Sequence, residues 1–217
     1  MSEDIKKRVV DELYFDNRVD ASEIEVAVKD GNVTLEGEVD SFYTRSAAAE
    51  DAWAVIGVTD VHNELDVSYP VEIEIMSDED IASSIDSKLL WNTAIDSTKI
   101  DVSVDGGVIE LEGTVDAYWK KLRAGTLAMD VSGVMDVHNE LAVVPTYDYV
   151  DEAIAKDIMD SLERRFTVDE EKVNVEVENG IVTLTGTVED YTAYTSAENA
   201  AELTAGVIDV ENKLYVK

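Results

Sequence analysis

The chain has 217 residues, no cysteine, and 49 acidic against 17 basic residues, which gives a formal net charge of −32 at pH 7. Without cysteine there can be no disulfides, thiolate metal sites or thiol nucleophiles, and the strong negative charge argues against nucleic-acid binding. The first residues contain no apolar signal segment, and no apolar run is long enough to span a bilayer, so we expect a cytoplasmic protein.

Two sequence motifs each occur three times, and the distance between the two motifs is the same in each copy. The first occupies Gly31–Asp40, Gly107–Asp116 and Gly180–Glu189. The second occupies Gly57–Leu65, Gly133–Leu141 and Gly206–Leu214. A constant spacing with linkers of variable length indicates three copies of one folded unit. We therefore expect three small domains, called repeats 1, 2 and 3 below, over residues 1–69, 77–145 and 150–217.

Each repeat begins with apolar residues four positions apart, such as Ile5, Val9 and Leu13, which predict one face of an amphipathic helix. Acids such as Asp78 and Asp80 near a helix start can cap it. Alternating β-branched residues and a turn containing glycine then predict a β-hairpin. The glycine inside the second strand, at 37, 113 and 186, indicates a bulge or a close approach of backbone.

An alanine-rich second helix follows the hairpin, and a last strand closes the repeat. We expect these helices over Ser41–Val55, Tyr118–Val131 and Tyr191–Thr204, with Gly57, Gly133 and Gly206 as left-handed caps. The last strands are expected over Val61–Val67, Val137–Val143 and Val210–Val216. The predicted fold class is α+β: three tandem α-β-β-α-β units, each a three-stranded mixed sheet packed by two helices.

This pattern resembles the BON domain, a module of bacterial osmotic-shock and nodulation proteins. The residues that carry the resemblance in repeat 1 are Gly31, Val33, Leu35, Gly37, Val39, Gly57, Val58, Val61, Asn63 and Leu65, and equivalents occur in the other repeats. The resemblance implies a non-enzymatic module, mostly periplasmic, that binds phospholipid surfaces or partner proteins and is linked to envelope and osmotic stress.

The residues themselves point to no catalytic or metal site, and we expect no cofactor. The two histidines, His62 and His138, occupy equivalent positions where repeat 3 has Glu211, so we interpret them as polar strand residues. The shared asparagines at 63, 139 and 212 are expected to bond nearby backbone. No acidic run has the spacing of an EF-hand loop.

The first candidate contact lies at the start of the second helix of repeat 2. Its residues are Tyr118, Trp119, Lys120, Lys121 and Arg123. An aromatic and basic helix end suits a membrane interface or an acidic partner, although the aromatic could also pack on its own sheet with the cations solvated or paired.

The second candidate contact lies at the end of the first helix of repeats 1 and 2. Tyr14 with Phe15, and Leu90 with Trp91, follow the core leucines, whereas repeat 3 has Glu163 and Arg164 there. The fold therefore does not require a bulky apolar pair at this place. These side chains cover the edge of their own core, pack between repeats, or contact another chain.

We expect a non-enzymatic cytoplasmic binding or scaffold protein with three BON domains, linked to osmotic or envelope stress. A first alternative is a cation-responsive protein that binds potassium or calcium, and a second is a module that binds phospholipid surfaces. The expected partners are accordingly a protein or a membrane surface, a monovalent or divalent cation, or a further copy of the chain, and not nucleic acid.

Overall fold

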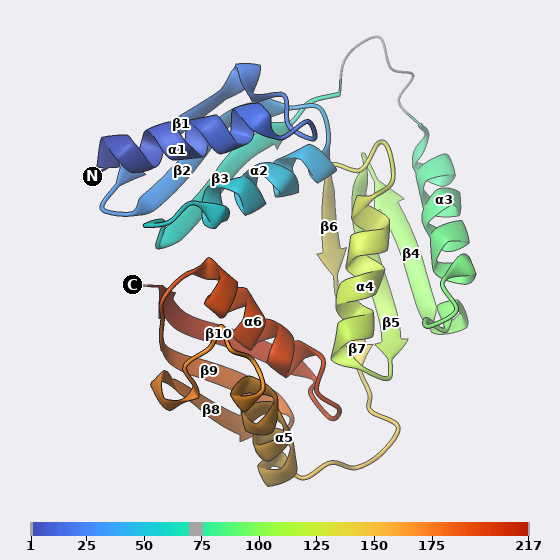
Figure 1. The fold of residues 1–217 in the computed structure, drawn as a ribbon. Coiled ribbons are helices and arrows are strands. Elements are labelled where there is room, and N and C mark those ends of the chain that lie inside the picture. The colour runs from blue at the N-terminus through green and yellow to red at the C-terminus, as the bar shows by residue number, and fades with distance from the viewer. Residues whose placement is uncertain (1, 70–75, 217) are drawn as a thin grey trace. The chain divides into compact units, whose positions relative to one another are not determined.

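The computed structural model describes residues 2–69 and 76–216, so Met1, Lys217 and residues 70–75 lie outside the described part of the chain. Each repeat has the same order of elements (Figure 1). Repeat 1 contains α1 Ser2–Phe15, η1 Ala21–Glu23, β1 Ile24–Lys29, β2 Asn32–Val39, α2 Phe42–Ala54 and β3 Asp60–Val67. Repeat 2 contains α3 Asp78–Trp91, η2 Ser97–Lys99, β4 Ile100–Asp105, β5 Val108–Val115, α4 Tyr118–Met129, β6 Asp136–Asn139 and β7 Ala142–Val143. Repeat 3 contains α5 Asp151–Glu163, η3 Glu170–Lys172, β8 Val173–Glu178, β9 Ile181–Val188, α6 Tyr191–Glu202 and β10 Asp209–Val216.

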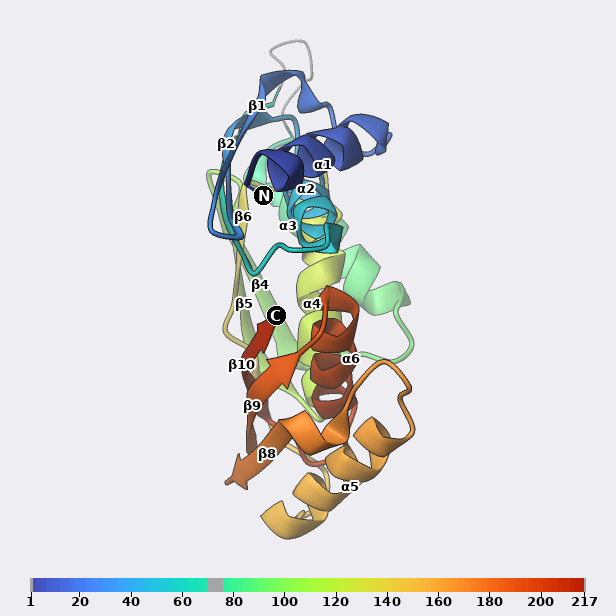
Figure 2. The ribbon, with the colours of Figure 1, turned by 60° about the vertical axis from the view of Figure 1, so that its left-hand side comes forward.

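The second strand of each repeat is the middle strand of its sheet. In repeats 1 and 3 the first strand pairs with it antiparallel through the hairpin, and the last strand pairs with it parallel after the helical crossover. The two helices of each repeat lie on one face of the sheet (Figure 2). The mixed sheet predicted from the sequence is therefore confirmed. In repeat 2 the expected strand over Val137–Val143 is divided into β6 and β7 at Glu140 and Leu141.

The apolar positions predicted for the first helices form the cores. Ile5, Val9 and Leu13 are buried in one cluster with residues of β1 and β2 and with Ala48 and Ala52 of α2. A fully buried aliphatic side chain stabilises the folded state by about 1.5–3 kcal/mol. Alanines on the buried face of α2 let the helix lie close to the sheet, and Ala197 and Ala201 are buried in the same way on α6.

The glycine within each second strand marks a close approach rather than a bulge. Gly37 is paired in register with Ile24 on one side and Leu65 on the other, so the ladder is continuous. Its φ of +127° is accessible to glycine, and a Cβ built there would lie 2.0 Å from the carbonyl oxygen of Glu23. Gly113 and Gly186 have the same geometry against Lys99 and Lys172.

The second helices end earlier than expected, and the prediction that Gly57, Gly133 and Gly206 cap them directly is wrong. α2 ends at Ala54 with Val55 as the cap, and Gly57 lies in the loop beyond it with φ of +96°. A Cβ at Gly57 would meet Cδ1 of Ile5 at 3.2 Å, so this loop passes closely over the first helix. The glycine is thus required by the crossing of loop and helix rather than by the helix end.

An aspartate at the start of the first helix holds the hairpin turn in two of the repeats. The Asp78 carboxylate accepts the backbone N–H groups of Gly106 (2.9 Å) and Gly107 (3.0 Å). Asp151 accepts those of Asn179 (2.8 Å) and Gly180 (2.9 Å). The corresponding residue of repeat 1 is Ser2, so this tie is specific to repeats 2 and 3.

Candidate interaction surfaces

The end of α1 presents two aromatic side chains to solvent. Tyr14 and Phe15 are each 76% exposed, although the preceding Leu13 is fully buried. Their rings meet edge to face with centroids 5.4 Å apart, a favourable arrangement for an aromatic pair. Of the three possibilities raised by the sequence, covering the edge of their own core does not apply to Tyr14 and Phe15.

The end of α3 repeats this arrangement in repeat 2. Leu89 is buried, whereas Leu90 is 70% exposed and Trp91 is 84% exposed. The helix positions these residues because its buried stripe passes through Ile81, Ile85 and Leu89 and turns the next two positions outward. Both candidate pairs therefore occupy the same place in equivalent folds.

Repeat 3 also exposes an aromatic side chain near this place, which sequence reasoning missed. Helix α5 ends at Glu163, and Phe166 in the following turn is 99% exposed. Residues 164 and 165 are arginines, and their side chains form no ion pair or hydrogen bond within residues 2–69 and 76–216. Glu163 and Arg164 align with the aromatic pairs of the other repeats, and the exposed phenylalanine lies two residues further along, outside the aligned positions.

The basic start of α4 is less accessible than its sequence suggests. Tyr118, Trp119, Lys120 and Lys121 are all partly buried, and Arg123 is exposed. Burial raises the pKa of Tyr118 to about 12. Lys120 pairs with Asp116 at 2.7 Å and lies 5.6 Å from the ring centroid of Trp119. The structure therefore brings these residues together on one helix end, but two of them already interact within the repeat.

Two of the three shared asparagines connect the last strand to the second helix, whereas Asn212 only accepts the N–H of Leu214 at 3.2 Å and its Nδ2 has no hydrogen-bond partner among the described residues. Asn63 Nδ2 donates to the carbonyl oxygen of Arg45 at 2.8 Å, and its Oδ1 accepts the N–H of Leu65 at 3.3 Å. Asn139 makes the same two bonds, to Lys121 at 2.7 Å and from Leu141 at 3.4 Å. These bonds agree with the backbone role that the sequence suggested.

The histidines lie on the solvent side of the last strands. His62 is exposed, and its Nε2 lies 3.4 Å from Oδ2 of Asp60. Within residues 2–69 and 76–216, no three histidine or carboxylate side chains are grouped so that they could hold a metal ion. In the same residues, no helix is both long and apolar enough to cross a bilayer.

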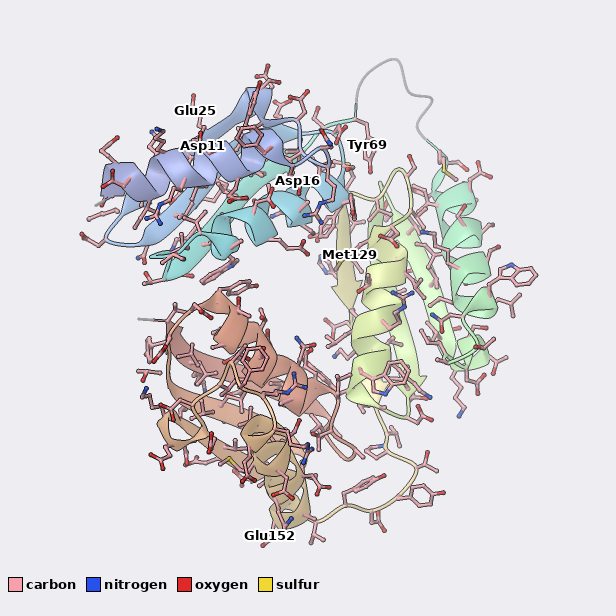
Figure 3. All side chains as sticks on the ribbon, in the orientation of Figure 1. Asp11, Asp16, Glu25, Tyr69, Met129 and Glu152 are labelled. Carbon is pink, nitrogen blue, oxygen red and sulfur yellow. The ribbon has the colours of Figure 1, made fainter. Side chains whose placement is uncertain are left out.

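A charged network that the sequence did not reveal joins residues just after α1 to α2, and one of its members, Asp16, is labelled in Figure 3. The guanidinium of Arg18 binds Asp16 at 2.7 Å and Glu50 at 3.2 Å, and lies 3.7 Å from Asp51. Asp51 Oδ2 is buried and has no hydrogen-bond partner among the described residues. Burial and the nearby charge of Asp16 raise the pKa of Asp51 to about 6, whereas hydrogen bonds from Arg18 lower the pKa of Asp16.

Comparison with known proteins agrees with the repeated architecture. The BON domain matches residues 2–69, 77–145 and 150–217. Osmotically-inducible protein Y of Escherichia coli is 34% identical over 140 residues, which are 63% of this chain and 70% of that protein. The 21 kDa hemolysin of Actinobacillus pleuropneumoniae is 28% identical over 135 residues, 61% of this chain and 69% of that protein.

Among solved structures, CdsD, a structural protein of the type III secretion system of Chlamydia trachomatis, is 16% identical to this chain. The alignment covers 97% of this chain and 91% of that one, with a TM-score of 0.26. The family assignment therefore rests on the sequence match to the domain in all three repeats and on the matching order of elements. The chain belongs to the BON domain family and carries three tandem copies of that domain.

Proposed function

We propose that the chain is a non-catalytic binding protein of the osmotic or envelope stress response, and that it contacts its partner through the exposed ends of its first helices. The observation that carries the proposal is the exposure of Tyr14, Phe15 and their counterparts in repeat 2, directly after fully buried leucines. Burying an aromatic side chain in a contact is favourable, and aromatic residues are enriched at the centre of protein interfaces.

The stress association is supported by the similarity to a protein named for osmotic induction. The absence of catalysis is supported by the use of the residues that the repeats share. The shared apolar residues form the cores, the glycines permit close backbone approaches, and two of the asparagines bond the second helix. The cytoplasmic location stays a prediction, which subcellular fractionation would test.

The two alternatives have less support. Cation binding has no cluster of ligands within the described residues to carry it. Phospholipid binding depends on the basic start of α4, where Lys120 is already paired with Asp116 and Trp119 is partly buried. Anionic lipid would also have to attract a chain whose net charge is −32.

The test is complementation of a strain that lacks the gene. Wild type should restore growth at raised osmolarity, and a variant with Tyr14, Phe15, Leu90 and Trp91 changed to serine should not, although it accumulates and folds. A control variant with Ile56→Ser and Tyr215→Ser, which changes side chains of comparable exposure elsewhere, should restore growth. Growth restored by the fourfold variant would overturn the proposal.

A further inference from the structure

The turn after α5 carries an unusual combination of side chains, which we call the knuckle: Arg164, Arg165 and Phe166. Phe166 is 99% exposed, and neither guanidinium has an ion-pair partner among the described residues. This is unexpected in a chain with 49 acidic and 17 basic residues. Arg164 caps α5, where a cation is favourable beside the helix C-terminus, but that role does not require an exposed phenylalanine.

The end of α1 carries charge opposite to that of the knuckle. Its last turn contains no basic residue, and Asp11 and Glu12 are exposed beside Tyr14 and Phe15. The nearby Arg18 is held by Asp16 and Glu50. The helix C-terminus adds its own partial negative charge, so this surface is suited to receive a cation together with an aromatic ring.

A pocket lies beside Phe166 in the knuckle. It has a volume of about 240 Å³, and its walls include Val168 and Ala193 together with the charged Asp169, Lys172 and Glu189. That volume lies below the range of small-molecule sites, about 300–1,000 Å³. The knuckle therefore offers both a protruding ring and a recess.

We propose that the knuckle of one copy of the chain docks on the end of α1 in a second copy, so that copies associate head to tail. The arginines would bind the carboxylates of Asp11 and Glu12, and Phe166 would pack against Tyr14 and Phe15. This contact is heterologous, because its two surfaces differ, and its repetition adds further copies. The inference rests on the proposed use of the helix ends as contact surfaces and names the partner at one of them.

The net charge sets the conditions for this association. Two chains of −32 repel one another at low ionic strength, but the Debye length is about 8 Å at physiological salt, so distant charges are largely screened. A contact made by three side chains of the knuckle and one helix end should bury little surface, and small interfaces belong to the weak and transient class. We therefore expect a concentration-dependent association that is absent at low ionic strength.

Sedimentation equilibrium of the full chain tests the proposal through two complementary variants. The knuckle variant carries Phe166→Ser, Arg164→Gln and Arg165→Gln, and the helix-end variant carries Tyr14→Ser and Phe15→Ser. Wild type should exceed the mass of one chain, 23.9 kDa, as concentration rises, and each variant alone should remain at that mass. An equimolar mixture should form a complex of two chains, because each variant keeps the surface that the other lacks. A control with Leu203→Ser and Tyr215→Ser should behave as wild type.

Wild type that remains at 23.9 kDa at every concentration and salt would overturn the proposal, including the case in which the knuckle closes on α1 of its own chain. So would wild type that remains monomeric but sediments with anionic phosphatidylglycerol vesicles through Phe166. A wild-type complex that neither variant weakens, or a mixture that does not associate, would do the same. The fourfold serine variant could fail to restore growth and still sediment with the same mass as wild type at every concentration. That result would leave the proposed function standing and refute this inference alone.

Discussion

The interior of each repeat and the end of its first helix differ in how far the three repeats agree with one another. Ile5, Val9 and Leu13 in repeat 1 have direct equivalents in repeats 2 and 3, and all are buried. One residue further along, the three repeats differ: an aromatic pair, a leucine with a tryptophan, or an exposed glutamate with the aromatic delayed to the next turn. The contrast teaches that the fold determines the first set of residues, and that the second set is available for interaction.

The largest effect on stability should come from adding a methyl group at the glycine of the second strand, where another stretch of backbone passes closely. Gly113→Ala places Cβ 2.1 Å from the carbonyl oxygen of Lys99 at a φ of +119°, so the strands must separate. We expect a loss of more than about 4 kcal/mol in the free energy of unfolding of repeat 2. Gly106→Ala is the matched control, because nothing lies within 4 Å of its Cβ at a φ of +57° and the cost should be about 1 kcal/mol. Urea denaturation of both variants measures the difference.

Two neighbouring leucines of α3, one buried and one exposed, give the sharpest comparison between the interior and the surface. Leu89→Ala removes a fully buried side chain and should destabilise repeat 2 by about 3 kcal/mol. Leu90→Ala, in a side chain that is 70% exposed, should change stability by less than about 0.5 kcal/mol. Equal losses in thermal or urea denaturation would show that Leu90 is part of the core after all.

The charged network between α1 and α2 should give repeat 1 a pH dependence of its own. Because the pKa of Asp51 is about 6 in the folded chain and its ordinary value is 3.8, the folded state binds this proton more tightly than the unfolded state. Lowering the pH through 6 should therefore stabilise repeat 1 until the ordinary pKa is reached. The gain should be on the order of 1–2 kcal/mol and is lost again as pH rises.

Asp51→Asn should remove this part of the pH dependence and stabilise the chain at neutral pH, because the buried oxygen no longer carries charge. Glu50→Gln is the matched control, since Glu50 also contacts Arg18 but its side chain is 64% exposed. Unfolding free energies measured on either side of pH 6 test both variants. An unchanged slope in Asp51→Asn would assign the effect to other groups, such as Asp16 and Glu12, whose charges act on Asp51.

The smallest effect concerns the tie between the first helix and the hairpin turn. Asp151→Ala leaves the N–H groups of Asn179 and Gly180 without their acceptor and should cost repeat 3 about 1 kcal/mol, because both groups can turn to water. Ser2→Asp should introduce the same tie into repeat 1 and stabilise it by a similar amount. Hydrogen exchange at the turn amides would detect either change.

The sequence allowed the fold to be predicted wherever local pattern and tertiary packing agree. Apolar spacing located the buried face of α1, and the glycine turn located the hairpin between β1 and β2. The ends of the second helices could not be predicted, because Gly57 is required by the passage of its loop over Ile5, a contact far apart in sequence. The division of the last strand of repeat 2 has no evident cause in its residues.

The candidate surfaces could be predicted from the sequence only where they lie on a helix whose buried face is known. The exposure of Tyr14 and Trp91 follows from their helical phase relative to the buried leucines, which the sequence contains. Phe166 lies beyond the last turn of α5, where helical phase no longer indicates direction. The network around Arg18 joins Asp16 to Glu50 and Asp51 on another helix, and no local pattern indicates such a meeting.

The separation of interior and helix ends is tested most directly by measuring stability and function in one variant. In the fourfold serine variant at positions 14, 15, 90 and 91, we predict an unfolding midpoint close to that of wild type and no restoration of growth at raised osmolarity. A fall in stability comparable to that of Leu89→Ala, or growth equal to wild type, would contradict the account.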